Sequence, residues 1–114
     1  METLYEWLEN LKSSNKLIIV EGKKDKKVLE QFGIKSISIS NKPVYEVVEK
    51  IALENKECIL LLDLDSEGKK MYSILKHQLQ KHKLKIDQTF REFLFKNTKL
   101  TQIEGLEHYL NKNR

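Results

Sequence analysis

Hydrophobic residues recur along this chain at two spacings, one typical of helices and one typical of strands. Helical spacing predicts an amphipathic helix within residues 1–15, where the repeating side chains are Leu4, Trp7, Leu8 and Leu11. Residues 17–20 follow as a short aliphatic run that is apolar on both faces, as in a buried parallel strand. Helical spacing returns over residues 25–32, 44–52, 66–82 and 103–110, and strand-like runs cover residues 34–39, 57–62 and part of 84–95.

This alternation of strands and helices predicts an α/β fold with a mainly parallel sheet of about four strands flanked by helices. We expect a single domain over residues 1–114, with its core in residues 16–99 and a C-terminal helix within residues 100–114. Residues 57–62 form the most hydrophobic strand and should be central. Parallel sheets of this kind bind ligands at the carboxyl ends of their strands, so candidate functional residues are sought there.

Composition narrows the class of protein. Charged residues make up 33% of the chain and hydrophobic residues 39%, and no apolar run approaches the roughly 18–20 residues that span a bilayer. The single cysteine, Cys58, cannot form an intramolecular disulfide, which favours a reducing compartment. We therefore expect a cytoplasmic protein without a membrane partner. The net charge of +4 is a mild excess, and it comes mostly from lysines that lie close to acidic positions.

Acidic residues follow two of the predicted strands. Glu21 comes directly after residues 17–20, and Asp63 and Asp65 come directly after residues 57–62. If these strands are neighbours, the three carboxylates meet at one edge, where their mutual repulsion favours a bound cation. Magnesium prefers such hard oxygen ligands. A structural alternative also stands, because an Asp in this place can cap the following helix, and Asp65 or Ser66 could do so.

Each acidic segment is followed by a glycine and two lysines: Gly22, Lys23 and Lys24 after the first, and Gly68, Lys69 and Lys70 after the second. Helix N-termini attract phosphate, and the glycines would let a phosphate backbone approach closely. Further basic residues at Arg91, Lys96 and Lys99 could form another edge of the same surface. Few aromatic residues interleave with these lysines, so we expect salt-dependent binding directed at the backbone of a nucleic acid.

Residues 20–22, Val-Glu-Gly, together with residues 63–68, Asp-Leu-Asp-Ser-Glu-Gly, resemble the TOPRIM domain. This Rossmann-like domain is shared by topoisomerases, bacterial primases, recombination-repair proteins, old-family nucleases and the 5S ribosomal RNA maturation nuclease. The resemblance covers residues 16–99. The third acid of the pattern makes residues 63–68 most similar to the type IA topoisomerase form.

The resemblance implies specific roles. Asp63 and Asp65 would be Mg²⁺ ligands, with Glu67 as a third, and Mn²⁺ could replace Mg²⁺. Glu21 would act as a general acid or base, or help to hold the metal. Ser66 stands where the family usually has a basic residue, so a phosphate contact is either missing here or supplied by a nearby lysine.

Two functions remain open at this stage. The chain could be a nuclease or nucleotidyl transferase acting on RNA or DNA, alone or as a homodimer. It could instead be a non-catalytic subunit that binds nucleic acid or protein within a larger complex. Three other classes are disfavoured. Receiver-like domains and Asp-x-Asp phosphatases place their acidic pairs after the first strand, whereas the pair here follows a later one. Dinucleotide-binding folds need a Gly-x-Gly-x-x-Gly loop, which this chain lacks.

Overall fold

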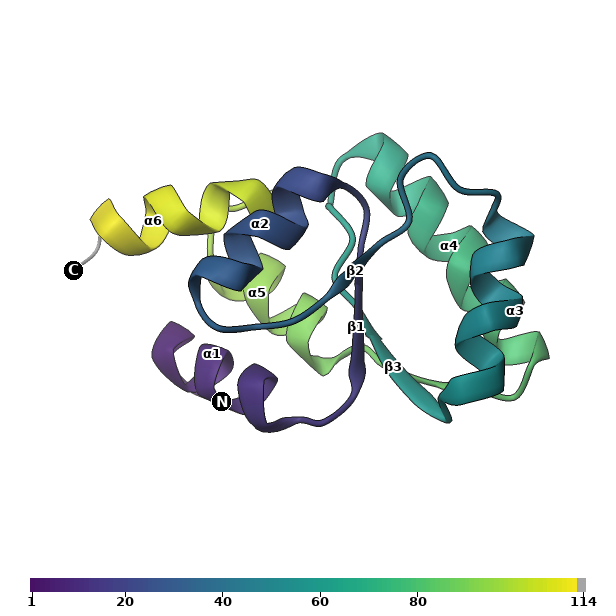
Figure 1. The fold of residues 1–114 in the computed structure, drawn as a ribbon. Helices are drawn as coiled ribbons and strands as arrows, with labels where there is room; N and C mark the ends of the chain where they lie inside the picture. The colour runs from purple at the N-terminus through teal and green to yellow at the C-terminus, as the bar shows by residue number, and fades with distance from the viewer. Residues whose placement is uncertain (113–114) are drawn as a thin grey trace.

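The computed structural model of the protein describes residues 1–112 and shows a four-stranded parallel sheet between two layers of helices (Figure 1). The strand order is β2-β1-β3-β4. The strands are β1 (Leu17–Val20), β2 (Ile37–Ser38), β3 (Glu57–Leu60) and β4 (Lys85–Asp87). The predicted α/β fold with about four parallel strands is confirmed.

The two central strands, β1 and β3, set the position of any ligand site. They pair in parallel with Ile19 opposite Leu60, so their carboxyl ends reach the same edge of the sheet. From β1 the chain moves outward to β2 and then returns to β3 on the other side of β1. This reversal is a topological switch point, where α/β folds open a crevice. The prediction that residues 57–62 contain a central strand is confirmed.

Helices cover both faces of the sheet (Figure 1). One face carries α1 (Leu4–Ser13), α2 (Lys23–Gln31), α5 (Thr89–Asn97) and α6 (Leu106–Lys112). The other face carries α3 (Val44–Glu54) and α4 (Ser66–Lys81). None of the helices described within residues 1–112 is long and apolar enough to cross a membrane.

Each central strand contributes side chains to two separate cores, because successive residues of a strand point to opposite faces. Ile18 and Val20 pack under α1, α2 and α5, whereas Ile19 packs under α3 and α4. Trp7 is fully buried in the first core, and its Nε1–H donates to the carbonyl of Phe90 at 2.8 Å. β1 is therefore apolar on both faces because each face packs against its own layer of helices, as predicted for a buried parallel strand.

Two elements differ from the sequence prediction. The strand expected over residues 34–39 is reduced to Ile37–Ser38. The segment 84–95 does contain a strand, β4, but its second half forms α5, a helix that we did not predict. Phe90 and Leu94 are four residues apart and both buried, which is helical spacing within too short a window to recognise easily.

Candidate active site at the carboxyl edge of the sheet

Glu21 follows β1 directly and lies at the carboxyl edge of the sheet. Its Oε1 is buried and has no hydrogen-bond partner. Burial raises the pKa of Glu21, and the negative charges of Asp65, Asp25 and Glu67 raise it further. A buried carboxylate oxygen without a donor is costly, and residues 1–112 supply none to Oε1 of Glu21.

Asp63 is buried at the same edge, beyond the end of β3. Its Oδ1 accepts a hydrogen bond from the backbone N–H of Ile103 at 2.8 Å. Burial raises its pKa to about 6 against the opposing effect of this hydrogen bond, and the charges of Asp25, Glu21 and Asp65 add to the increase. The structure therefore brings Glu21, Asp63 and Asp65 within electrostatic reach of one another.

Asp65 occupies the N-cap of α4, as the structural alternative anticipated. Its Oδ1 accepts from the backbone N–H of Gly68 at 2.8 Å, and its Oδ2 accepts from Nε2 of Gln102 at 3.2 Å. These two hydrogen bonds lower the pKa of Asp65. Because both oxygens already have donors, a cation at Asp65 would share or displace the Gln102 amide.

Gly68 is required by the backbone of the protein itself. A Cβ at this position would lie 2.2 Å from the carbonyl oxygen of Asp63, far inside van der Waals contact. The absence of a side chain lets the first turn of α4 pack directly against the segment that carries Asp63. This close approach between two parts of the chain is sufficient to explain the glycine. We expected Gly68 for a different reason, the approach of a phosphate backbone, and that contact stays a prediction.

Gly22 is the N-cap of α2, and its N–H donates to Oδ2 of Asp25 at 3.0 Å. We did not predict Asp25 as a residue of the site, yet it is buried next to Gly22. Burial raises its pKa, and the charges of Glu104 and Asp65 raise it further although the Gly22 N–H opposes them. The spacing between Gly22 and Asp25 could have revealed this contact, because an acidic residue three positions after an N-cap is typical of a capping box.

Arg91 differs most from its predicted role. We expected it on a basic outer edge with Lys96 and Lys99, but it is partly buried and turned toward the site. Its Nε donates to the carbonyl of Leu62 at 2.9 Å, and its Nη2 donates to the carbonyl of Asp63 at 3.1 Å. The guanidinium lies 4.1 Å from the ring centroid of Tyr72. Arg91 thus holds the backbone of the Asp63 segment by its planar fork of donors.

A second support comes from residues 101–103, which we call the strap. The carbonyl of Thr101 accepts from the N–H of Leu64 at 2.7 Å. Gln102 and Ile103 donate to Asp65 and Asp63 as described above. Because these contacts join residues about 40 positions apart, such as Ile103 and Asp63, no local sequence pattern could have revealed them.

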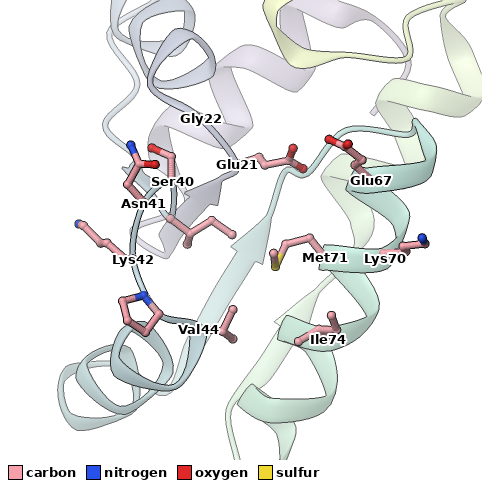
Figure 2. A pocket seen from close by; sticks show the side chains of 12 residues that line it. Glu21, Gly22, Ser40, Asn41, Lys42, Val44, Glu67, Lys70, Met71 and Ile74 are labelled. Atoms are coloured by element: carbon pink, nitrogen blue, oxygen red, sulfur yellow. The ribbon is translucent and has the colours of Figure 1, made fainter.

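An open groove of about 770 Å³ adjoins Glu21 (Figure 2). It runs between residues 39–44, which lead into α3, and one face of α4. Figure 2 shows the side chains of Glu21 and Glu67 pointing toward each other at one end of the groove, with Met71 pointing into it. Apolar side chains also line it, namely Ile39, Pro43, Val44 and Ile74, together with polar ones from Ser40, Asn41, Lys42 and Lys70.

The predicted phosphate-binding lysines surround this edge. Lys23 and Lys24 lie at the start of α2, Lys69 and Lys70 lie in α4, and all four are exposed. Lys70 lines the groove beside Glu67. A second hollow of about 390 Å³, which we call the basic groove, is lined mainly by Lys23, Lys26, Lys27 and Lys42.

The carboxylates fit a weakly held divalent cation. Among the residues that the structure describes, no three acidic, histidine or cysteine side chains form a group that could hold a metal ion. Magnesium, however, is usually bound by one or two protein carboxylates together with water and substrate phosphates. The unpaired Oε1 of Glu21 and the crowded charge around Asp63 suit such a cation. The metal-binding roles of Glu21, Asp63, Asp65 and Glu67 remain predictions.

The architecture and the acidic edge define a class, the Rossmann-like α/β domains that carry carboxylates beyond their two central strands. A family model described as "Toprim domain" matches residues 15–90. A UPF0292 protein of Methanocaldococcus jannaschii is 33% identical over 118 residues, which cover 97% of this chain and 92% of that protein. A UPF0292 protein of Pyrococcus abyssi is 32% identical over 106 residues, which cover 91% of this chain and 79% of that protein.

One solved structure is also similar. It is described as a putative protein from Aquifex aeolicus and superimposes with a TM-score of 0.85 at 37% sequence identity. The similarity covers 91% of this chain and 98% of that one. The chain belongs to the Toprim domain family. This confirms the resemblance seen in residues 20–22 and 63–68, and at the level of the family it indicates metal-dependent chemistry on nucleic acids.

Proposed function

We propose that this protein carries out Mg²⁺-dependent phosphodiester chemistry on nucleic acid, as a nuclease or a nucleotidyl transferase. The observation that carries the proposal is the buried, unpaired Oε1 of Glu21 at the sheet edge that also bears Asp63. Two central strands deliver these carboxylates to one place, where burial and the repulsion between neighbouring carboxylates raise their pKa values, and a bound cation would offset that repulsion. A purely structural edge would have no need of such an arrangement.

Each acidic residue has a distinct part in this proposal. Asp63 and Asp65 hold Mg²⁺ with help from Glu21, and Glu67 stands nearby as a further ligand. Bound there, Mg²⁺ supplies positive charge that offsets the charge developing on the phosphoryl oxygens. Arg91 and the strap keep the segment of Asp63 in position through backbone hydrogen bonds. Preorganisation of this kind lowers the cost of assembling the reactive geometry.

Glu21 takes the part of general acid or base in this proposal. Burial and the surrounding negative charges raise its pKa above the ordinary value of 4.5. A raised pKa favours proton exchange by a carboxyl group near neutral pH. Its side chain lines the groove at the acidic edge, where an attacking water or hydroxyl group would approach.

The lysines supply the interaction with the nucleic-acid backbone. The basic groove brings Lys23, Lys26, Lys27 and Lys42 together, with Glu30 as the one acidic residue among the described residues that line it. Lysines bind phosphates as point charges without reading base sequence. Binding should therefore tolerate different sequences and weaken steeply with salt.

A cleavage assay tests the proposal. Wild type and Asp63→Asn would be incubated with labelled RNA and DNA substrates, in Mg²⁺ and in chelator, alongside Glu49→Gln, which changes an exposed acid on α3. We expect cleavage or transfer by wild type and Glu49→Gln in Mg²⁺ only, and almost none by Asp63→Asn. Equal turnover by Asp63→Asn would end the proposal. Tight binding without turnover on any substrate would support the non-catalytic alternative instead.

A further inference from the structure

The groove beside Glu21 has a composition that phosphate binding does not explain. Its wall is aliphatic, and Ile74 remains 48% exposed there although it is a large hydrophobic residue. Met71 and Ile74 are three residues apart and therefore lie on one face of α4. A surface that served only a sugar-phosphate backbone would be basic and polar. Apolar side chains directly beside the carboxylates favour a ligand that carries an apolar group next to its phosphate.

We propose that this groove binds an unpaired nucleobase of a single-stranded nucleic acid, next to the phosphodiester that lies at Glu21. The inference rests on the proposed function and extends it to the substrate class. Glu21 and Gly22 form one end of the groove, so a nucleotide whose phosphate lies at the acidic edge would direct its base between Val44 on one side and Met71 and Ile74 of α4 on the other.

The dimensions and polar groups of the groove agree with a nucleotide. Its volume of about 770 Å³ falls within the range of roughly 300–1,000 Å³ that is usual for small-molecule sites. Ser40 and Asn41 lie on the opposite side from α4. The Ser40 hydroxyl already shares a hydrogen bond of 2.9 Å with that of Ser38, so the Asn41 amide is the group offered to the edge of a base. Lys42 and Lys70 stand on the two sides of the groove, and Figure 2 shows their amino groups pointing outward from it, where they would meet phosphates that flank the bound nucleotide rather than the base.

The geometry also selects between single and double strands. In a duplex the faces of the bases are stacked and covered, so only an unpaired base can lay its face against an aliphatic wall. Within the described part of the chain, no aromatic residue lines the groove. The contact would therefore be aliphatic packing against the base, with little discrimination between bases.

Fluorescence anisotropy in chelator, which prevents turnover, tests the proposal with three labelled probes. These are a short single-stranded oligonucleotide, an abasic strand of the same length and a blunt duplex. We expect wild type to bind the base-bearing single strand at least about fivefold more tightly than the abasic strand, because the base buries apolar surface against the groove. Ile74→Ser should reduce this preference, and Ile74→Trp, which places a stacking surface on the wall, should increase it. Leu53→Ser is the matched control, since Leu53 is 87% exposed on α3 and does not line the groove.

The outcomes separate this inference from the proposed function. Equal binding of all three probes by wild type would overturn the nucleobase site and leave phosphodiester chemistry standing, with the groove assigned to another apolar ligand such as a peptide side chain. An unchanged preference in both Ile74 variants would overturn it as well. Failure to bind any of the three probes would overturn the nucleobase site, and the cleavage assay in Mg²⁺ would then decide the proposed function independently.

Discussion

The carbonyl oxygen of Asp63 lies where a Cβ on Gly68 would come within 2.2 Å of it. The candidate site is therefore built on a contact between two segments of backbone, which no side-chain rearrangement can relieve. Replacement of Gly68 by Ala should displace α4 or the Asp63 segment. Overpacking of this kind typically costs about 1–3 kcal/mol, which exceeds the gain of up to about 1 kcal/mol from the better helix former. Urea unfolding would measure the loss.

Gly22→Ser provides the matched control for that change. A Cβ at Gly22 meets nothing closer than Oδ2 of Asp25 at 3.6 Å, and serine is also a good N-cap residue. Its effect should stay within about 0.5 kcal/mol. If Gly68→Ala lowered the free energy of unfolding no more than Gly22→Ser does, the close packing of α4 against the Asp63 segment would be contradicted.

The charge of Asp63 should destabilise the metal-free protein at neutral pH. Its pKa of about 6 lies above the ordinary value of 3.8, so the folded protein takes up a proton before the unfolded chain does. The penalty is complete above pH 6 and disappears as the pH falls from about 6 to about 4. In chelator at pH 7.5, Asp63→Asn should raise the free energy of unfolding by about 1–3 kcal/mol. Thermal melts across this pH range would show the gain, and a loss of stability would contradict the account.

The same substitution at Asp87 should have the opposite effect. Oδ2 of Asp87 lies 2.7 Å from Nζ of Lys16, and Oδ1 accepts from the N–H of Thr89 at 2.9 Å. Burial pushes the pKa of Asp87 up, but these partners outweigh it and keep the pKa below 3.8. The stabilisation is therefore present above about pH 4 and is lost as the pH falls further. Asp87→Asn should cost about 1 kcal/mol at pH 7.5 because the pair is partly exposed. A gain in stability would be inconsistent with a stabilising ion pair.

Arg91 should act on metal binding without touching the metal. Arg91→Lys keeps the charge but loses the fork that contacts the carbonyls of Leu62 and Asp63. We expect a loss of about 1–2 kcal/mol in stability and about tenfold weaker Mn²⁺ binding by calorimetry. Lys96→Ala on the same helix is the control, since Lys96 is exposed and should leave Mn²⁺ affinity unchanged. Unaltered Mn²⁺ affinity in Arg91→Lys would show that its hydrogen bonds do not position the site.

The parts of the site that depend on strand order could be predicted from the sequence. Glu21 and Asp63 follow apolar runs of the type that become central parallel strands, so their common edge follows from the general behaviour of such sheets. Asp25 could have been recognised from its spacing to Gly22. Arg91 and Ile103 could not, because their contacts with the Asp63 segment depend on how α5 and the strap pack after folding. Long-range backbone hydrogen bonds leave no local signature in a sequence.

The proposed function depends most on whether a divalent cation binds at the carboxylates that follow the two central strands, β1 and β3. Crystals grown with Mn²⁺, measured at a wavelength where manganese scatters anomalously, test this directly. The account predicts an anomalous peak about 2.0–2.3 Å from a carboxylate oxygen of Asp63, with Glu21 or Asp65 as a second protein ligand. A saturated crystal with no peak there, or with its only ordered Mn²⁺ on another surface, would contradict it.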